Sequence, residues 1–269
     1  MICTDQESNC LGDIETSEPE SLYKYYAFNK YTEGIYKHNK VYFPPPESFN
    51  DPFDSKIYIT YEGSTKKRRQ FLLDKFNKLF PNKSRKNLLE HAKKLVKEGE
   101  DIAELQRSLE KSANKLRKKI GVFCLTEKRD NILMWTHYSA QHTGFCLKFD
   151  AKNKFFLRSQ KVKYDKVLPI INVLCTYPPI EEAQKILTKA EDWKYEKEWR
   201  IVDYKKGPGV QKYPEEALTG VILGCWTSDE NKQKIREWCG KRRYCPTLYQ
   251  AKEKEKEYGL DIVVKFRSF

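Results

Sequence analysis

The chain has 269 residues, of which 39% are hydrophobic and 13% aromatic, which is enough for one large domain with a real core and excludes disorder throughout. Its 51 Lys and Arg against 38 Asp and Glu leave a formal net charge of +13, which favours a polyanionic partner. No run approaches the roughly 18 apolar residues of a membrane helix, and the acidic N-terminus (MICTDQESNC) lacks the features of a signal peptide. We therefore expect a cytoplasmic protein without a membrane partner.

The first segments along the chain predict an acidic lead followed by the start of a single α+β domain. Residues 1–20 carry six acidic and no basic side chains, and the domain is expected over residues 21–269. Period-two aromatic residues predict a strand at Leu22–Phe28. A short helix at Tyr31–His38 and a strand at Val41–Phe43 follow. The turn-rich sequence SFNDPFD then predicts an ordered loop.

Residues 64–120 differ in character from what precedes them. They carry 18 Lys and Arg against seven acids, and their apolar residues recur at helical spacing. This pattern predicts two or three amphipathic helices that form an inserted basic helical subdomain. Such a block attracts polyanions, so we expect nucleic acid there; a solvated helix face and an acidic protein partner are the open alternatives.

The remaining elements alternate between strands and short helices. Predicted strands are 121–126, Thr143–Asp150, 160–174 with a break at Pro169, Tyr195–Asp203, Val221–Gly224, and a closing pair at 247–252 and 260–266. Predicted helices are Asn131–Ser139, Pro178 to about Lys189, and one that begins with a Thr227–Glu230 capping box and ends at Gly240. Short turns between strands favour a mixed, mainly antiparallel α+β fold over a parallel α/β fold.

The cysteines and histidines do not have the spacing of a metal site. There are eight cysteines, none in a CxxC pattern, and four histidines. Cys124, Cys146 and Cys225 lie in apolar runs, which is typical of buried free thiols. We expect buried thiols, with disulfides and metal ligands as the alternatives, and no metal.

The segment WKYEKEWRIV is the most informative for chemistry. On a strand, Glu196, Glu198 and Arg200 share one face, with the two carboxylates about 7 Å apart. That arrangement suits a general base or an anchor for sugar hydroxyls. A solvent-facing strand with ordinary ion pairs explains the same pattern.

Two further segments carry candidate binding groups. In the predicted helix, Trp135 and Tyr138 lie on one side, where Tyr138 can stack on a flat ring and His137 can titrate or donate. A core helix whose histidine bonds a backbone carbonyl is the alternative. Lys24 lies mid-strand between Tyr23 and Tyr25, where it can approach a phosphate or extend to solvent.

The loop SFNDPFD offers Asn50, Asp51 and Asp54 for a cation or a sugar, although a turn scaffold explains these residues equally well. The motifs GxGxxG, GxxxxGK[ST], GxSxG and HExxH are absent from the sequence, which argues against Rossmann, P-loop, α/β-hydrolase and zincin proteins.

The order LYKYYAFN, VYF, SFNDPFD, FCLTEKRDNILMWTHYSAQHTGFCLKFD and DWKYEKEWRIV resembles the family called domain of unknown function 2971, over roughly residues 22–60 and 121–266. The opening strand–helix–strand, the aromatic HY helix and the late E.E strand more distantly resemble the ADP-ribosyl transferase superfamily. That superfamily includes bacterial toxins and phage-defence effectors that modify nucleic acid.

The second resemblance implies a split β-sheet core, NAD as substrate, and site residues. It implies that Glu198 is the catalytic glutamate, that Glu196 orients the acceptor and that Tyr138 stacks on nicotinamide. Lys24 stands where the superfamily has His or Arg, and His137 is a substitute for that group. The expected cofactor-binding set is completed by Tyr25, Asn50, Trp135 and Arg200.

We therefore expect an NAD-dependent ADP-ribosyl transferase that modifies RNA or DNA, with nucleic acid on residues 64–120 and an antitoxin or regulatory protein as a further partner. One alternative is a metal-dependent nuclease, with Asp51, Asp54, Glu196 and Glu198 around the cation. The other is a non-catalytic module that binds nucleic acid or a protein partner.

Overall fold

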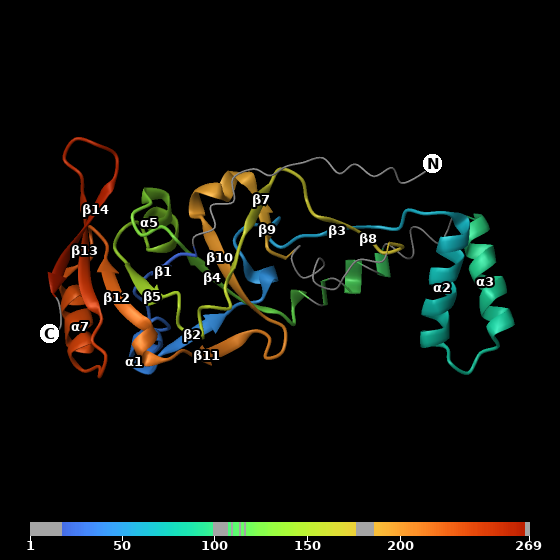
Figure 1. The fold of residues 1–269 in the computed structure, drawn as a ribbon, viewed down its shortest axis with the longest axis horizontal. Coiled ribbons are helices and arrows are strands. Elements are labelled where there is room, and N and C mark those ends of the chain that lie inside the picture. Colours follow the sequence, from blue (N-terminus) through green and yellow to red (C-terminus); the bar gives the residue numbers. More distant parts are fainter. Residues whose placement is uncertain are drawn as a thin grey trace.

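The structure is a computed structural model that describes residues 18–98, 107–108, 110–112, 114–115, 117–175 and 186–266. The expected acidic lead lies outside the described residues up to position 17. Among the described residues, no helix has the length and apolar character needed to cross a membrane. Figure 1 shows an elongated molecule with the main sheet towards one end and two helices at the other.

One eight-stranded sheet has the order β14-β13-β12-β5-β1-β4-β10-β6. Its pairs are antiparallel except β12 with β13, which run parallel and are connected through helix α7 (Asp229–Gly240). The strands are β1 Ser21–Tyr26, β4 Gly121–Thr126, β5 Phe145–Asp150, β6 Gln160–Lys161, β10 Glu198–Asp203, β12 Leu218–Leu223, β13 Thr247–Glu253 and β14 Leu260–Phe266. The expected α+β class and the closing pair β13–β14 are confirmed.

The sheet is weakly joined between β1 and β4. Six residue pairs connect β1 to β5, whereas a single pair, Tyr23 with Thr126, connects β1 to β4. Further along β4, the segment after β2 lies beside it, because the Val122 backbone N–H donates to the Pro44 carbonyl at 2.9 Å. The main sheet is therefore two sets of strands that separate beyond Tyr23.

Three two-stranded sheets are separate from the main one. Strands β2 (Lys40–Phe43) and β11 (Gly209–Lys212) pair antiparallel. The other two sheets pair in parallel: β3 with β8 and β7 with β9. Their bounds are β3 Tyr58–Thr60, β7 Lys163–Asp165, β8 Ile170–Asn172 and β9 Thr188–Ala190. The short helices are α1 Glu33–His38 and the 3₁₀ helices η1 Pro46–Ser48, η2 Glu191–Glu196 and η3 Glu215–Ala217.

Alternation along the strands places an apolar layer on each face of the main sheet. On one face, Leu22 of β1 joins a cluster with Ile235 and Trp238 of α7. On the other face, Tyr25 of β1 packs against Trp135 of α5 (Ile132–Tyr138), with ring centroids 5.0 Å apart. Helix α5 is thereby held against the strands β1 and β5.

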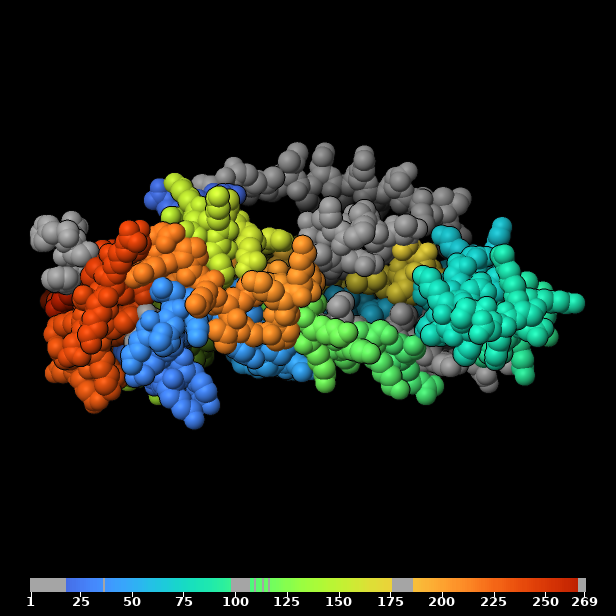
Figure 2. Space-filling view, turned by 90° about the horizontal axis from the view of Figure 1, so that it is seen from below, coloured from blue at the N-terminus to red at the C-terminus, as the bar shows by residue number. Residues whose placement is uncertain are grey.

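Helices α2 (Thr65–Leu79) and α3 (Arg85–Glu98) form a hairpin at the far end of the long axis from β14. Their contact is a small cluster of Leu72, Ala92 and Val96. Figure 2 shows the pair as a block at one end of the molecule. Two of the predicted helices in residues 64–120 are confirmed, and their role as a subdomain stays a prediction.

Several predicted boundaries are wrong. The strand predicted at Tyr195–Asp203 begins only at Glu198, because residues up to 196 form η2. The helix predicted from Pro178 lies outside the described residues up to position 185, and its predicted end is part of strand β9. Helix α7 is capped by Ser228, whose hydroxyl accepts from the Asn231 N–H, while the Thr227 hydroxyl donates to the Gly144 carbonyl.

Candidate functional site

A cavity of about 370 Å³ opens where β1 and β4 separate. Its walls come from β1, β4, α5, the loop after β2, β9, η2 and β10. Its volume lies within the range of small-molecule pockets, about 300–1,000 Å³. The predicted site residues that line it are Lys24, Tyr25, Asn50, His137, Tyr138, Glu196 and Glu198.

Trp135 and Arg200 were predicted to bind the cofactor, but neither side chain reaches this cavity. Each is fully buried. The Trp135 indole N–H donates to the Arg129 carbonyl, so the ring anchors α5 in the core. Arg200 lies behind the cavity wall, where carboxylates hold it.

Glu196 reaches the cavity by a route that differs from the predicted strand. It is the last residue of η2, and Lys197 after it has a left-handed backbone with φ of 46°. The Thr126 hydroxyl donates to the Glu196 carbonyl, which fixes this turn beside β4. The turn, and not a shared strand face, brings Glu196 next to Glu198.

Lys189 of β9 lies between these acids and was not predicted as a site residue. Its Nζ is 2.5 Å from Glu196 Oε2, 3.1 Å from Glu198 Oε2 and 3.7 Å from Asp54 Oδ2. Its side chain is only 5% exposed. The sequence around Lys189, a single lysine shortly after the apolar pair Ile186–Leu187, does not indicate a site residue. The pairing of β9 with β7 directs the Lys189 side chain inwards.

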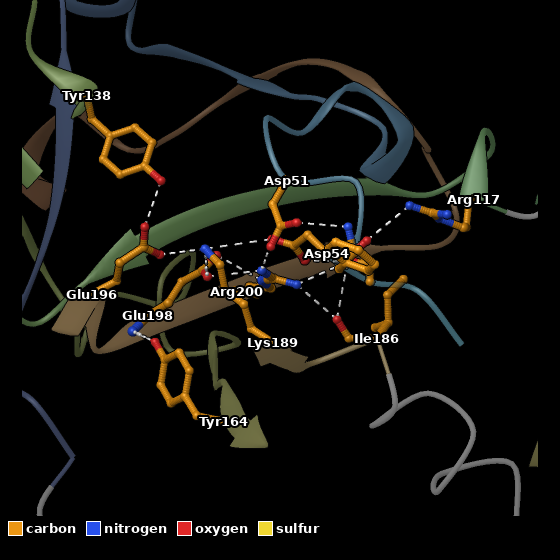
Figure 3. A network of polar contacts seen from close by, with 12 residues as sticks. Asp51, Asp54, Arg117, Tyr138, Tyr164, Ile186, Lys189, Glu196, Glu198 and Arg200 are labelled. Carbon is orange, nitrogen blue, oxygen red and sulfur yellow. Dashed lines mark hydrogen bonds and ion pairs between the residues drawn. The ribbon is translucent and has the colours of Figure 1, made fainter. Parts of the chain in front are cut away.

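Arg200 holds the other side of the acid cluster, as Figure 3 shows. Its Nε donates to Glu198 Oε1 at 2.8 Å and its Nη2 to Glu198 Oε2 at 3.0 Å. The same Nη2 donates to Asp54 Oδ2 at 2.8 Å, and Nη1 bonds Ser55 and the Ile186 carbonyl. Three carboxylates and two cations leave this cluster with a formal net charge of −1.

Within this cluster, the pKa values of Glu198 and Lys189 are shifted towards their ionised forms. Burial alone raises the pKa of Glu198, but the charges of Arg200 and Lys189 outweigh it and hold the pKa at about 2. Burial alone lowers the pKa of Lys189, but the carboxylates of Glu198, Glu196 and Asp54 outweigh it and raise the pKa above its usual value. Glu198 is therefore anionic and Lys189 cationic at neutral pH.

Tyr138 connects α5 to the cluster. Its hydroxyl donates to Glu196 Oε1 at 2.7 Å. Burial, followed by the charge of Glu196, raises the pKa of Tyr138 well above the usual tyrosine range. His137 is exposed but also lines the cavity. Tyr138 is thus a neutral donor in the wall.

The loop residues predicted to bind a cation have other partners. Asp51 Oδ1 accepts from the Phe53 N–H at 2.8 Å, as in a local turn, and Asp54 pairs with Arg200 and Lys189. Over the described ranges, no group of three or more His, Cys, Asp and Glu has the geometry of a metal site. The six described cysteines are free thiols. The nuclease interpretation gains no support from this arrangement.

A larger hollow of about 770 Å³ lies along β6 to β9 and is lined by residues such as Lys163, Asp165 and Ile170. Lys163 and Asp165 pair with each other at 3.2 Å at the surface. The hollow lacks the buried charges of the smaller cavity, and we place the candidate site in the smaller one.

Part of the site lies in a stretch of the chain that matches a family model. The model of a family described as "Protein of unknown function (DUF2971)" matches residues 134–201. This stretch contains Tyr138, Lys189, Glu196, Glu198 and Arg200. No curated protein and no solved structure matches the chain. The family resemblance is supported over these residues.

Proposed function

We propose that the protein is an NAD-dependent ADP-ribosyl transferase that acts on nucleic acid. The observation that carries the proposal is that Tyr138, Glu196 and Glu198, from α5, η2 and β10, line one cavity. Lys24 of β1 lines the same cavity. The opening between β1 and β4 is consistent with the split sheet that the resemblance implies.

The net negative charge of the acid cluster suits a reaction in which positive charge develops. The glycosidic bond between ribose C1′ and nicotinamide breaks, and its electron pair leaves with neutral nicotinamide. The resulting positive charge on the ribose is stabilised by the nearby carboxylates. An acceptor hydroxyl or amine then attacks C1′ and loses its proton to solvent. Lys24, which lines the cavity, is proposed to contact a phosphate of the NAD.

The acceptor is proposed to be RNA or DNA that contacts the α2–α3 hairpin. Helix α2 begins at Thr65 and continues with Lys66, Lys67, Arg68 and Arg69 in succession, with no acid in its first turn. Phosphate contacts of this kind position a nucleic acid without reading its sequence. An antitoxin or regulatory protein is retained as a predicted partner from the family resemblance.

The direct test incubates the protein with NAD labelled in its adenine ring and with RNA, DNA or cellular protein. We expect nicotinamide release and label transfer to nucleic acid. Tyr138→Ala should lower turnover about 10- to 100-fold through lost stacking. Tyr258→Ala is the matched control, since Tyr258 is fully exposed in the β13–β14 turn. If the unaltered protein neither releases nicotinamide nor transfers label, the proposal is rejected.

A further inference from the structure

The two glutamates of the site use their carboxylate oxygens differently. Glu198 receives both Nε and Nη2 of Arg200, at 2.8 and 3.0 Å, and its Oε2 also accepts from Lys189. A guanidinium fork matches a carboxylate with two parallel bonds and fixes its plane. Glu198 lines the cavity, but both of its carboxylate oxygens are held by Arg200.

Glu196 has no guanidinium partner among its described bonds. Its Oε1 accepts from the Tyr138 hydroxyl at 2.7 Å and its Oε2 from Lys189 at 2.5 Å. Each carboxylate oxygen can accept a further hydrogen bond. Because Tyr138 itself lies in the cavity wall, the Oε1 side of Glu196 is the side that a ligand can approach.

Lys189 occupies the centre of the acid cluster. Its Nζ lies within 3.7 Å of oxygens from Asp54, Glu196 and Glu198, and 4.9 Å from the Trp193 ring centroid. Carboxylate oxygens are the donors that a divalent cation prefers in proteins, although with Lys189 in place these three carboxylates do not have the geometry of a metal site. Here a covalently attached ammonium lies among them, so its position is set by β9.

We propose that Lys189 is a positioning residue whose ammonium replaces a metal ion, and that Glu196, held by it, is the carboxylate that contacts the ligand. Glu198 then anchors Lys189 and Arg200 and does not touch the ligand. This reverses the roles that the family resemblance implies for the two glutamates. The inference rests on the proposed function for its activity readout only.

The first experiment compares Glu196→Gln with Glu198→Gln, using Glu230→Gln on the exposed face of α7 as the control. We expect Glu196→Gln to lower kcat for nicotinamide release about 100-fold or more, with a KM near that of the unaltered protein. Glu198→Gln should lower Tm strongly and, below its Tm, keep more activity than Glu196→Gln. The inference is overturned if Glu198→Gln is folded but inactive while Glu196→Gln is active.

The second experiment needs no turnover. Lys189→Ala leaves three carboxylates without their central cation, so it should bind Mn²⁺ at least tenfold more tightly than the unaltered protein, measured by electron paramagnetic resonance. Mn²⁺ should also raise the Tm of Lys189→Ala through binding to the folded state, while Lys189→Arg should gain neither effect.

The two experiments separate the inference from the proposed function. If the unaltered protein shows no NAD turnover, the proposed function fails and the Mn²⁺ measurement alone decides the role of Lys189. A folded Lys189→Ala that binds Mn²⁺ no better than the unaltered protein overturns the cation role. The cation role is also overturned if Mn²⁺ does not raise the Tm of Lys189→Ala while Lys189→Arg remains folded.

Discussion

Arg200 has no exposed surface, and its guanidinium lies 2.8 Å from carboxylate oxygens of both Glu198 and Asp54. Removing a charge from water is costly, and the pairing offsets that cost only while every partner is present. Deleting one partner of such a pair typically destabilises by about 3–5 kcal/mol. The charged residues of the site are therefore coupled to the stability of the whole domain.

We predict that Glu198 contributes to acid sensitivity. Its pKa falls from the ordinary 4.5 to about 2 in the folded chain. A depressed carboxyl pKa stabilises the fold above about pH 4.5, and that stabilisation, about 3 kcal/mol, is lost as the pH falls through 4.5 towards 2. Urea unfolding of Glu198→Gln between pH 7 and 2 should show a smaller loss of stability with acid than the unaltered protein.

The control for this prediction is Glu237→Gln, because Glu237 is exposed on α7 and bonds only a neighbouring glutamine among the contacts described. Its pH profile should follow that of the unaltered protein. Identical acid slopes for Glu198→Gln and the unaltered protein would show that Arg200 and Lys189 do not hold the Glu198 charge.

At the scale of elements, the site depends on how α5 and η2 are tied together. Asn131 caps α5, and its Oδ1 accepts from the Leu133 and Met134 N–H groups at 2.9 and 3.1 Å. Its Nδ2 donates to the Tyr195 carbonyl in η2 at 3.4 Å. One side chain thus starts the helix that bears Tyr138 and bonds the element that bears Glu196.

We predict that Asn131→Ala lowers the free energy of unfolding by about 1–2 kcal/mol, because α5 loses its cap. Asn131→Asp keeps the cap but loses the donor to Tyr195, so its stability should lie nearer that of the unaltered protein. Denaturant unfolding of the three proteins measures this order. Equal losses for both variants would mean that the cap contributes little and the link to η2 contributes most.

At the scale of the whole molecule, basic charge and the candidate site lie in different places. The α2–α3 hairpin stands at one end of the long axis, and the sheet that carries the cavity lies towards the other (Figure 1). A small ligand in the cavity does not need the hairpin, whereas an extended polymer can contact both. This separation agrees with a polymeric acceptor.

We predict that Lys66→Glu with Lys67→Glu weakens binding of a duplex oligonucleotide about tenfold or more near 0.1 M salt and lowers the slope of log affinity against log salt by about 2. Both lysines are exposed. The matched control is Lys252→Glu with Lys256→Glu, two exposed lysines at the β13–β14 end. Equal losses in both double variants would show that binding follows net charge and not the hairpin.

Several parts of this arrangement were accessible from the sequence, and their success has a local cause. The strand at β1, the helix with Met134 to Tyr138 and the closing pair β13–β14 follow from periodicity over a few residues. Where a tertiary contact overrides local pattern, prediction failed. Glu196 has strand-like neighbours, yet the left-handed Lys197 and the Thr126 bond turn it into η2.

The sequence by itself determined the α+β class, the basic segment, and the region of the chain that bears the site, because composition and residue spacing are properties of short stretches. Only the tertiary structure decided which groups meet. Lys189 and Asp54 are distant from each other in sequence, and they converge on Glu196 and Glu198 because of how β9, β10 and the loop after β2 pack. Ionisation of buried groups depends on such distances, and spacing along the chain does not encode them.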